Sequence, residues 1–149
     1  MSTNARIGYV LNDDSIVSVY HHWDGYPEWL GVVLNREYNT DAKVKELIDG
    51  GNMSSCYSDN NWDGSKCDPR PVYYSERGES LDDNAPRLSK TLSDLSEVND
   101  GSEYVYLWFM NSWNCYEIDK KFDDEWNVVN TTLSVRIIPP DHPQSMLAV

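Results

Sequence analysis

The feature that most constrains the fold is a pair of strand-like segments, residues 103–109 and 112–118, separated only by Met110 and Asn111. Both segments are rich in aromatic and β-branched residues, which favour strands. Two such segments joined by a short turn predict an antiparallel hairpin. The chain is therefore expected to be built at least partly on an antiparallel sheet.

Further elements precede and follow this hairpin. Residues 6–11 and 15–22 are typical of two strands around a polar turn. Pro27 suits the first turn of a helix over 27–38, because proline has no N–H to leave unpaired. A second helix is expected over 41–49, ending at two glycines. The other candidates are a strand at 71–75, a short helix at 89–98, added strands at 126–129 and 133–138, and a long loop at 52–70.

This order of elements predicts an α+β fold, with a mostly antiparallel sheet of about 4–6 strands and two or three helices packed on one face. A chain of 149 residues favours a single domain over 1–149. We expect its core to span about residues 6–138. The proline-rich tail, residues 139–149, is expected to be extended, and both a docked and a free tail remain open.

The formal net charge of −13 limits the partners of the protein. Such a charge repels the phosphates of nucleic acids and of anionic membranes, so we expect no direct nucleic-acid binding and no membrane binding. The charge either serves solubility or imitates DNA toward a basic partner. Residues 66–90 hold five basic and five acidic residues and are neutral overall. An anionic ligand would find its cations in that segment.

Three cysteines, an odd number, and an N-terminus without a signal-like pattern indicate reduced thiols and a soluble protein of the cytoplasm. No apolar run approaches the roughly 20 residues that cross a bilayer. A metal site could be drawn from either His21 or His22 with Cys56, Cys67 or His142, but none of these has the spacing of a known zinc motif. We therefore expect no metal and no cofactor.

The segment from His21 to Pro27 is the densest cluster of functional side chains. It lies where a strand gives way to a helix, whose first N–H groups can face an anion. Trp23 and Tyr26 could stack on a flat ring, while His22 and Asp24 could form hydrogen bonds with a ligand. The alternative is structural, with Asp24 in an Asx-turn and Trp23 in the core.

A second cluster lies at residues 75–79, where Arg77 and Glu79 flank a glycine. Glycine lets the backbone approach a phosphate and arginine binds its oxygens in a fork, so the segment resembles a phosphate-binding turn. The alternative is a surface arginine neutralised by a neighbouring glutamate. His22, Asp24, Arg77 and Glu79 also suit acid–base chemistry, but no catalytic motif accompanies them, so no catalytic residue is assigned.

Several motifs resemble a family of small, largely uncharacterised phage and prophage proteins. The resemblance rests on His-Trp-Asp-Gly-Tyr-Pro at 22–27, Tyr-Ser-Glu-Arg-Gly-Glu at 74–79, and the 103–106 strand with Trp113, and it covers most of residues 6–118. The family commonly has another residue in place of His21, which makes His22 the site histidine. The resemblance implies a phage accessory protein in the host cytoplasm, in which both clusters form one ligand-binding pocket.

Three functions follow as hypotheses. The first is a counter-defence protein that sequesters a small nucleotide-type immune signal through His22, Trp23, Asp24, Tyr26, Arg77 and Glu79. The second is an acidic, DNA-mimic-like inhibitor that binds a host nucleic-acid enzyme or CRISPR effector. The third is a small enzyme acting on a nucleotide or phosphoester, an activity less expected than binding. The abundance of tryptophan and tyrosine also permits a homo-oligomer.

Overall fold

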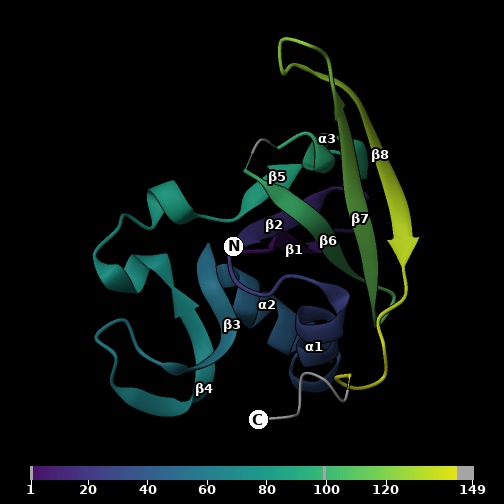
Figure 1. The fold of residues 1–149 in the computed structure, drawn as a ribbon. Coiled ribbons are helices and arrows are strands. Elements are labelled where there is room, and N and C mark those ends of the chain that lie inside the picture. Colours follow the sequence, from purple (N-terminus) through teal and green to yellow (C-terminus); the bar gives the residue numbers. More distant parts are fainter. Residues whose placement is uncertain (1, 99, 144–149) are drawn as a thin grey trace.

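The segments with the strongest strand patterns form the centre of a single sheet. In the computed structural model, which describes residues 2–98 and 100–143, eight strands form this sheet in the order β4-β3-β2-β1-β6-β7-β8, with β5 paired to β2 (Figure 1). The strands are β1 (Asn4–Val10), β2 (Ile16–His21), β3 (Met53–Asn60), β4 (Lys66–Tyr73), β5 (Arg87–Ser89), β6 (Ser102–Phe109), β7 (Ser112–Phe122) and β8 (Val128–Arg136). The β1–β2 and β6–β7 hairpins confirm the two hairpins expected from the sequence.

The predicted fold class was wrong. The described part of the chain is mostly β, with 43% of residues in strands against 23% in helices, and it has eight strands in place of about 4–6. The sheet is also mixed, because β1 runs parallel to β6 and β2 runs parallel to β3. The main cause is the segment 52–70, predicted as a loop, which forms the β3–β4 hairpin. β4 is the edge strand, β3 pairs with β2 only at Met53, and both strands are largely polar, so they lack the apolar alternation of a half-buried strand.

The helices cover both faces of the sheet, which corrects the prediction of a single covered face. The helical elements are a π-helical turn η1 (Pro27–Gly31), α1 (Val32–Glu37), α2 (Asp41–Asp49), two 3-10 turns η2 (Tyr74–Arg77) and η3 (Asp82–Asn84), and α3 (Leu92–Ser96). Residues of η1, α1 and α2 share the larger hydrophobic core with one face of the sheet. Leu95 of α3 packs on the opposite face in a smaller cluster with Ile16, Val105 and Leu107.

The edge of β2 that faces away from β1 is shared between two strands. β5 pairs with its first half, at Ile16–Ser18, and β3 pairs with its last residue at His21. Between them, the Tyr20 N–H donates to Oδ1 of Asn52 (2.9 Å). Asn52 therefore takes the place of a strand partner where β3 and β5 diverge.

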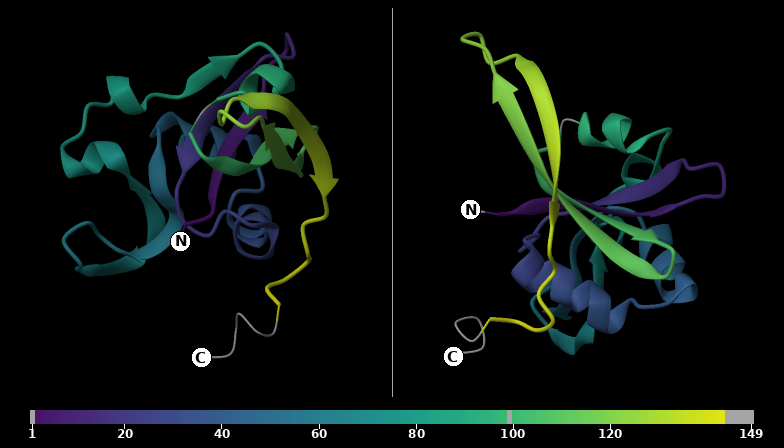
Figure 2. Two further views of the ribbon diagram at one scale, coloured as in Figure 1. Left: turned by 45° about the horizontal axis from the view of Figure 1, so that its top comes forward. Right: turned by 90° about the vertical axis from the view of Figure 1, so that its right-hand side faces the viewer.

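The far ends of β7 and β8 project beyond the rest of the sheet (Figure 2). The pairing between β6 and β7 runs from Phe109–Ser112 to Tyr104–Glu117, whereas the pairing between β7 and β8 continues to Phe122–Val128. Residues 118–133 therefore form a two-stranded ribbon, here called the arm. Its turn is held by Asp123, which accepts hydrogen bonds from the N–H groups of Glu125 and Asn127 (2.9 Å each).

The described part of the C-terminal tail lies against η1. Ile138 packs on the larger core, and its side chain lies so close to Gly31 that a Cβ at that position would crowd it. His142 Nδ1 lies 2.9 Å from the Glu28 carbonyl oxygen. The tail is therefore docked as far as His142, and the prediction for 144–149 falls outside the described residues.

Candidate functional site

The two histidines at the end of β2 have different surroundings, as the alternation of side chains along a strand requires. His21 is fully buried, and its Nε2 accepts the N–H of Cys56 (3.0 Å). Burial lowers the pKa of His21 to about 3, with a smaller contribution from His22. His21 is therefore a neutral core residue, and its Nδ1 is buried without a hydrogen-bond partner among the described residues.

His22 joins Tyr20 on the other face of the strand. Its Nδ1 lies 2.6 Å from the Tyr20 hydroxyl, and its ring meets the edge of Trp23 with centroids 4.6 Å apart. Burial raises the pKa of Tyr20 to about 12, and the Tyr74 hydroxyl adds to the effect. Tyr20 therefore keeps its proton near neutral pH and can donate it to Nδ1. In a neutral imidazole this leaves Nε2–H of His22 as the remaining donor.

Trp23 and Asp24 line a pocket of about 420 Å³. The other main walls are Trp29 of η1, with Tyr57 and Asp59 of β3. Asp24 adopts a left-handed backbone conformation (φ 53°) and accepts a long hydrogen bond from the Tyr26 hydroxyl (3.3 Å). This pocket combines aromatic surface with two carboxylates, which suits a flat ring carrying amine or hydroxyl donors better than a phosphate.

Arg77 lies on an aromatic platform that sequence reasoning missed. Its guanidinium carbon is 4.7 Å from the centre of the Trp62 ring and 5.1 Å from that of Tyr74. The two rings are stacked, with centroids 5.7 Å apart and planes inclined by 28°. Nε of Arg77 donates to Glu79 (2.8 Å), and the Arg77 side chain is 51% exposed. We call Trp62, Tyr74 and Arg77 the stacking cluster.

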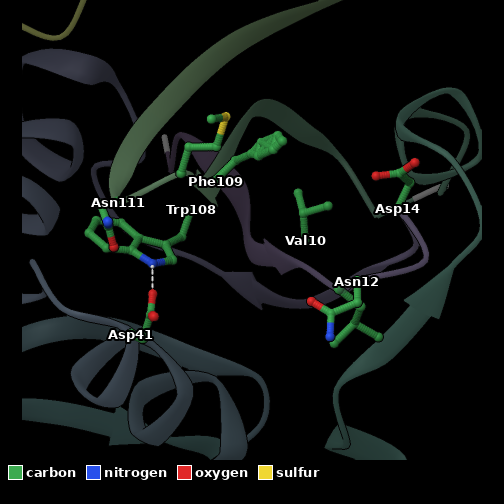
Figure 3. A pocket seen from close by; sticks show the side chains of 9 residues that line it. Val10, Asn12, Asp14, Asp41, Trp108, Phe109 and Asn111 are labelled. Carbon is green, nitrogen blue, oxygen red and sulfur yellow. Dashed lines mark hydrogen bonds between the residues drawn. The ribbon is translucent and has the colours of Figure 1, made fainter.

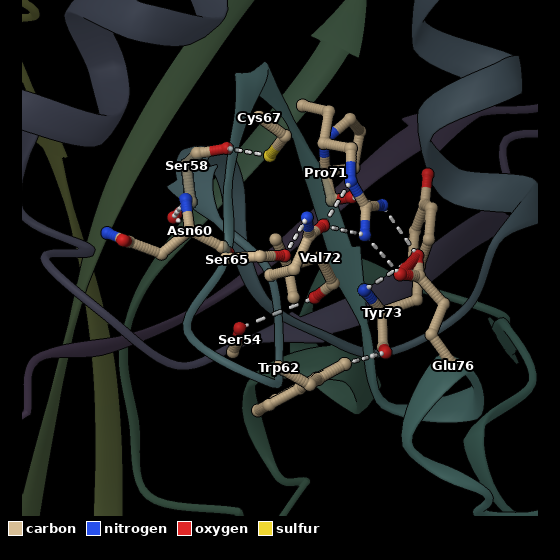
Figure 4. Close-up of polar contacts among 12 residues, drawn as sticks. Ser54, Ser58, Asn60, Trp62, Ser65, Cys67, Pro71, Val72, Tyr73 and Glu76 are labelled. Atoms are coloured by element: carbon tan, nitrogen blue, oxygen red, sulfur yellow. Dashed lines mark hydrogen bonds and ion pairs between the residues drawn. The ribbon is translucent and has the colours of Figure 1, made fainter.

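Arg70, by contrast, is fully engaged within the protein. It donates to both carboxylate oxygens of Glu76 (2.9 and 2.7 Å), to the Asn61 side chain and to the Pro71 carbonyl. The hydrogen bond from Arg70 lowers the pKa of Glu76. Close by, the indole N–H of Trp62 donates to the Tyr73 carbonyl (2.8 Å), which fixes one ring of the stacking cluster (Figure 4).

The two predicted clusters lie on either side of β3. The N–H groups of His22 and Trp23 donate to the carbonyls of Met53 and Ser54 (3.2 and 3.0 Å), so this segment continues along one edge of β3. On the other edge, the Tyr74 N–H donates to the Asn52 carbonyl (3.1 Å). Strands that flank a common neighbour are about two strand spacings apart, roughly 10 Å. The fold therefore places residues about 50 positions apart in the chain on opposite edges of one strand, and Arg77 and Glu79 do not line the pocket at Trp23 and Asp24.

Three hydrogen-bonded pairs organise these residues: Tyr20 with His22, Tyr26 with Asp24, and Arg77 with Glu79. No hydrogen bond or ion pair within residues 2–98 and 100–143 joins one predicted cluster to the other. Sequence reasoning missed Tyr20, Trp29, Tyr57, Trp62 and Tyr74 as contributors. The alternation of Tyr20 with His22 was a readable signal, whereas Trp62 lay in the segment taken for a loop.

A second cavity, of about 330 Å³, lies at the other end of the sheet. It is formed by the β1–β2 and β6–β7 turns, where Nε1 of Trp108 donates to Asp41 at the start of α2 (2.6 Å; Figure 3). Its charged walls are Asp14 and Asp41, so it offers no cation to an anionic ligand. Within the described residues, no group of three or more His, Cys, Asp or Glu side chains is arranged to hold a metal ion. The described helices are too short or too polar to cross a membrane.

No family model, curated protein or solved structure matches the chain. The resemblance to phage and prophage proteins therefore stays a prediction from the sequence motifs.

Proposed function

We propose that the protein binds and sequesters a small nucleotide-type anion, and that it does so as a phage accessory protein acting against host immunity. The base would lie against aromatic side chains, and a phosphate would be held by Arg77. This proposal keeps the leading hypothesis from the sequence and adds Trp62 and Tyr74 to the residues that carry it.

The stacking cluster is the observation that carries the proposal. A guanidinium over two stacked rings combines a phosphate-binding fork with a surface on which a base can stack. Arg77 is half-exposed and is paired with Glu79, a partner that a ligand phosphate can displace. Arg6 and Arg70, by contrast, are engaged in hydrogen bonds and ion pairs of the fold.

The two sides of β3 supply different chemistry for such a ligand. His22, held by Tyr20, offers a ring N–H donor to a phosphate oxygen. The pocket at Trp23 and Asp24 offers an aromatic wall and carboxylate acceptors for base amines or ribose hydroxyls. A ligand with two bases and a phosphate linkage would use both sides, and a mononucleotide would use the stacking cluster alone.

The hydrogen bonds favour binding over catalysis. His22 and Asp24 each pair with a tyrosine, so they do not form a histidine–carboxylate dyad with each other. The tyrosine pairings instead hold the two side chains in fixed orientations, which serves recognition.

The test is native mass spectrometry of the protein purified from cells with an active nucleotide-based immune system. We expect a discrete mass increment that is released on denaturation and absent from Arg77→Ala. Removing a charged hydrogen-bond partner costs about 1.5–3 kcal/mol, so affinity for the released compound should fall roughly 10–100-fold. Arg36→Ala, which removes an exposed arginine from α1, is the matched control and should retain the increment. A bare mass for the wild type, or equal increments in both variants, would contradict the proposal.

A second candidate is a protein-binding inhibitor, and the arm is the observation that favours it. The turn of the arm carries Asp123, Asp124 and Glu125 beside Trp126, which is 81% exposed. An acidic projection with an exposed tryptophan suits a basic partner that has an apolar pocket. Replacing Trp126 with alanine would then abolish capture of the partner while leaving uptake of the small molecule unchanged.

A further inference from the structure

The two edges of the sheet differ in how they are protected against pairing. The β4 edge carries Pro69 and Pro71, which cannot donate hydrogen bonds to another strand. β8, at the other edge, has nine residues with no proline or glycine, and five of them are β-branched. Its outer side has no partner strand among residues 2–98 and 100–143. β8 is therefore the edge on which a further strand can add.

The charge of β8 indicates what that strand can be. The whole chain carries −13, yet β8 has a single charged residue, Arg136 at its end. A second copy of this acidic protein would be repelled at most surfaces, but a nearly neutral strand lowers that cost. A strongly basic or acidic partner would find no complementary charges along β8.

The exposed side chains of β8 also favour the addition of a partner strand. Val129 and Val135 are 62% and 77% exposed, on the face of the strand that also carries Leu133. A two-stranded ribbon such as the arm is only marginally stable by itself. A partner strand would widen the arm and cover these valines.

We propose that β8 pairs antiparallel with β8 of a second copy, about a twofold axis through Thr132. In this register Val129 faces Val135 of the other copy, Thr131 faces Leu133, and Asn130 faces Ser134. Between positions 129 and 135, apolar residues meet apolar or β-branched ones and polar residues meet polar ones. No two like charges are opposed, because Arg136 faces Val128. The strand is thus self-complementary in the arrangement that a twofold dimer requires.

The test uses charges placed at the facing positions. The wild type should form a dimer of twice the 17.2 kDa chain mass in sedimentation-equilibrium or light-scattering measurements. Val129→Glu or Val135→Lys alone would each place a charge against a valine of the other copy. Because the substitution occurs twice in the dimer, we expect each to raise the dissociation constant at least about tenfold. Both side chains are exposed in the single copy, so the variants should fold, as circular dichroism would verify.

The double variant Val129→Glu/Val135→Lys gives the decisive result. Positions 129 and 135 of one strand are six residues apart, roughly 20 Å, so the two new charges cannot meet within one copy. In the proposed register each faces the opposite charge on the other copy, and dimerisation should return to within about threefold of the wild type. Leu88→Glu, at an exposed position of β5, is the control and should leave the dimer intact.

Each remaining outcome overturns the proposal. If the wild type stays monomeric up to about 100 μM, the dissociation constant of a β8 dimer is far above that concentration and the proposal is wrong. A dimer that ignores both single substitutions is held by another surface. A double variant that dimerises no better than the single ones excludes the register about Thr132.

Discussion

At the scale of single residues, neighbouring side chains of the same type have different roles because they lie on different sides of a strand. His21 is in the core, where its ring replaces a strand partner by accepting the Cys56 N–H. His22 lies beside Tyr20 on the other face. Arg70 and Arg77 also differ, because Arg70 in β4 is bonded to Glu76 whereas Arg77 in η2 lies exposed on aromatic rings. The residue type makes a side chain a candidate for function, but the groups that it contacts determine whether it is free to bind a ligand.

The depressed pKa of His21 predicts a loss of stability toward acid. The unfolded chain takes up a proton on this residue below about pH 6.5, whereas the folded protein resists protonation down to about pH 3. The free energy of unfolding should therefore fall as the pH drops through this window, by up to about 1.4 kcal/mol per pH unit from His21.

The variant His21→Gln isolates this contribution, because a glutamine side-chain carbonyl can accept the Cys56 N–H without titrating. Urea unfolding of both proteins between pH 7 and pH 4 should give a shallower pH dependence for the variant. The carboxylates titrate in both proteins and cancel in the difference. Equal slopes would mean that His21 takes up its proton at the same pH in the folded protein as in the unfolded chain.

At the scale of elements, a close contact joins the end of α2 to β4. Gly50 has an ordinary helical backbone, but a Cβ there would overlap the Tyr73 ring. That ring is held in place by its hydroxyl, which donates to the Leu47 carbonyl (2.7 Å). The glycine thus allows the strand's tyrosine to cover the end of the helix.

Gly50→Ala should therefore destabilise the protein although alanine favours helices. Displacing the Tyr73 ring and its hydrogen bond should cost about 1–3 kcal/mol, measurable as a lower urea midpoint with an unchanged slope. Removing the ring should relieve the clash, so the substitution should cost less in a Tyr73→Leu background than in the wild type. An equal cost in both backgrounds would place the strain elsewhere.

The elements that the sequence predicted correctly are those with an apolar face. The β1–β2 and β6–β7 hairpins and α2 all bury regularly spaced apolar side chains, so their period is readable. Apart from Met53, Cys56 and Val72, β3 and β4 bury few apolar side chains, and backbone pairing and polar contacts such as Arg70 with Asn61 also hold them. Such contacts leave no periodic pattern. Because this hairpin was predicted as a loop, Trp62 was also missed as a candidate site residue. The sequence named the two candidate clusters as segments, but their arrangement around β3 depends on parallel pairing that no local pattern specifies.

At the scale of the whole molecule, the net charge of −13 and the local positive charge of Arg77 predict opposite salt dependences for the two proposed interactions. Two acidic copies repel each other over distances that salt screens, with a Debye length of about 10 Å at 0.1 M and about 3 Å at 1 M. A phosphate bound at Arg77 is attracted by a nearby opposite charge, and salt weakens that attraction.

Raising sodium chloride from about 0.05 to 0.5 M should therefore lower the dissociation constant of the β8 dimer and raise that of the nucleotide-type ligand. Sedimentation equilibrium measures the first constant and isothermal titration calorimetry the second. A dimer that weakens steeply with salt would depend on ion pairs, which the nearly neutral β8 does not provide. A ligand insensitive to salt would be bound without help from Arg77.

The parallel pairing of β1 with β6 also sets the order in which the chain can fold. β1 lies in the middle of the sheet, and its Arg6 bonds to Asp100, 94 positions later. During synthesis the N-terminal hairpin must wait for residues 102–109 before that side of β1 is paired. Contacts this distant in sequence slow folding, because the entropy cost of closing a long loop comes before the pairing that offsets it. A nascent or truncated chain ending before Ser102 would leave one edge of β1 unpaired, and it is the species we expect chaperones to bind.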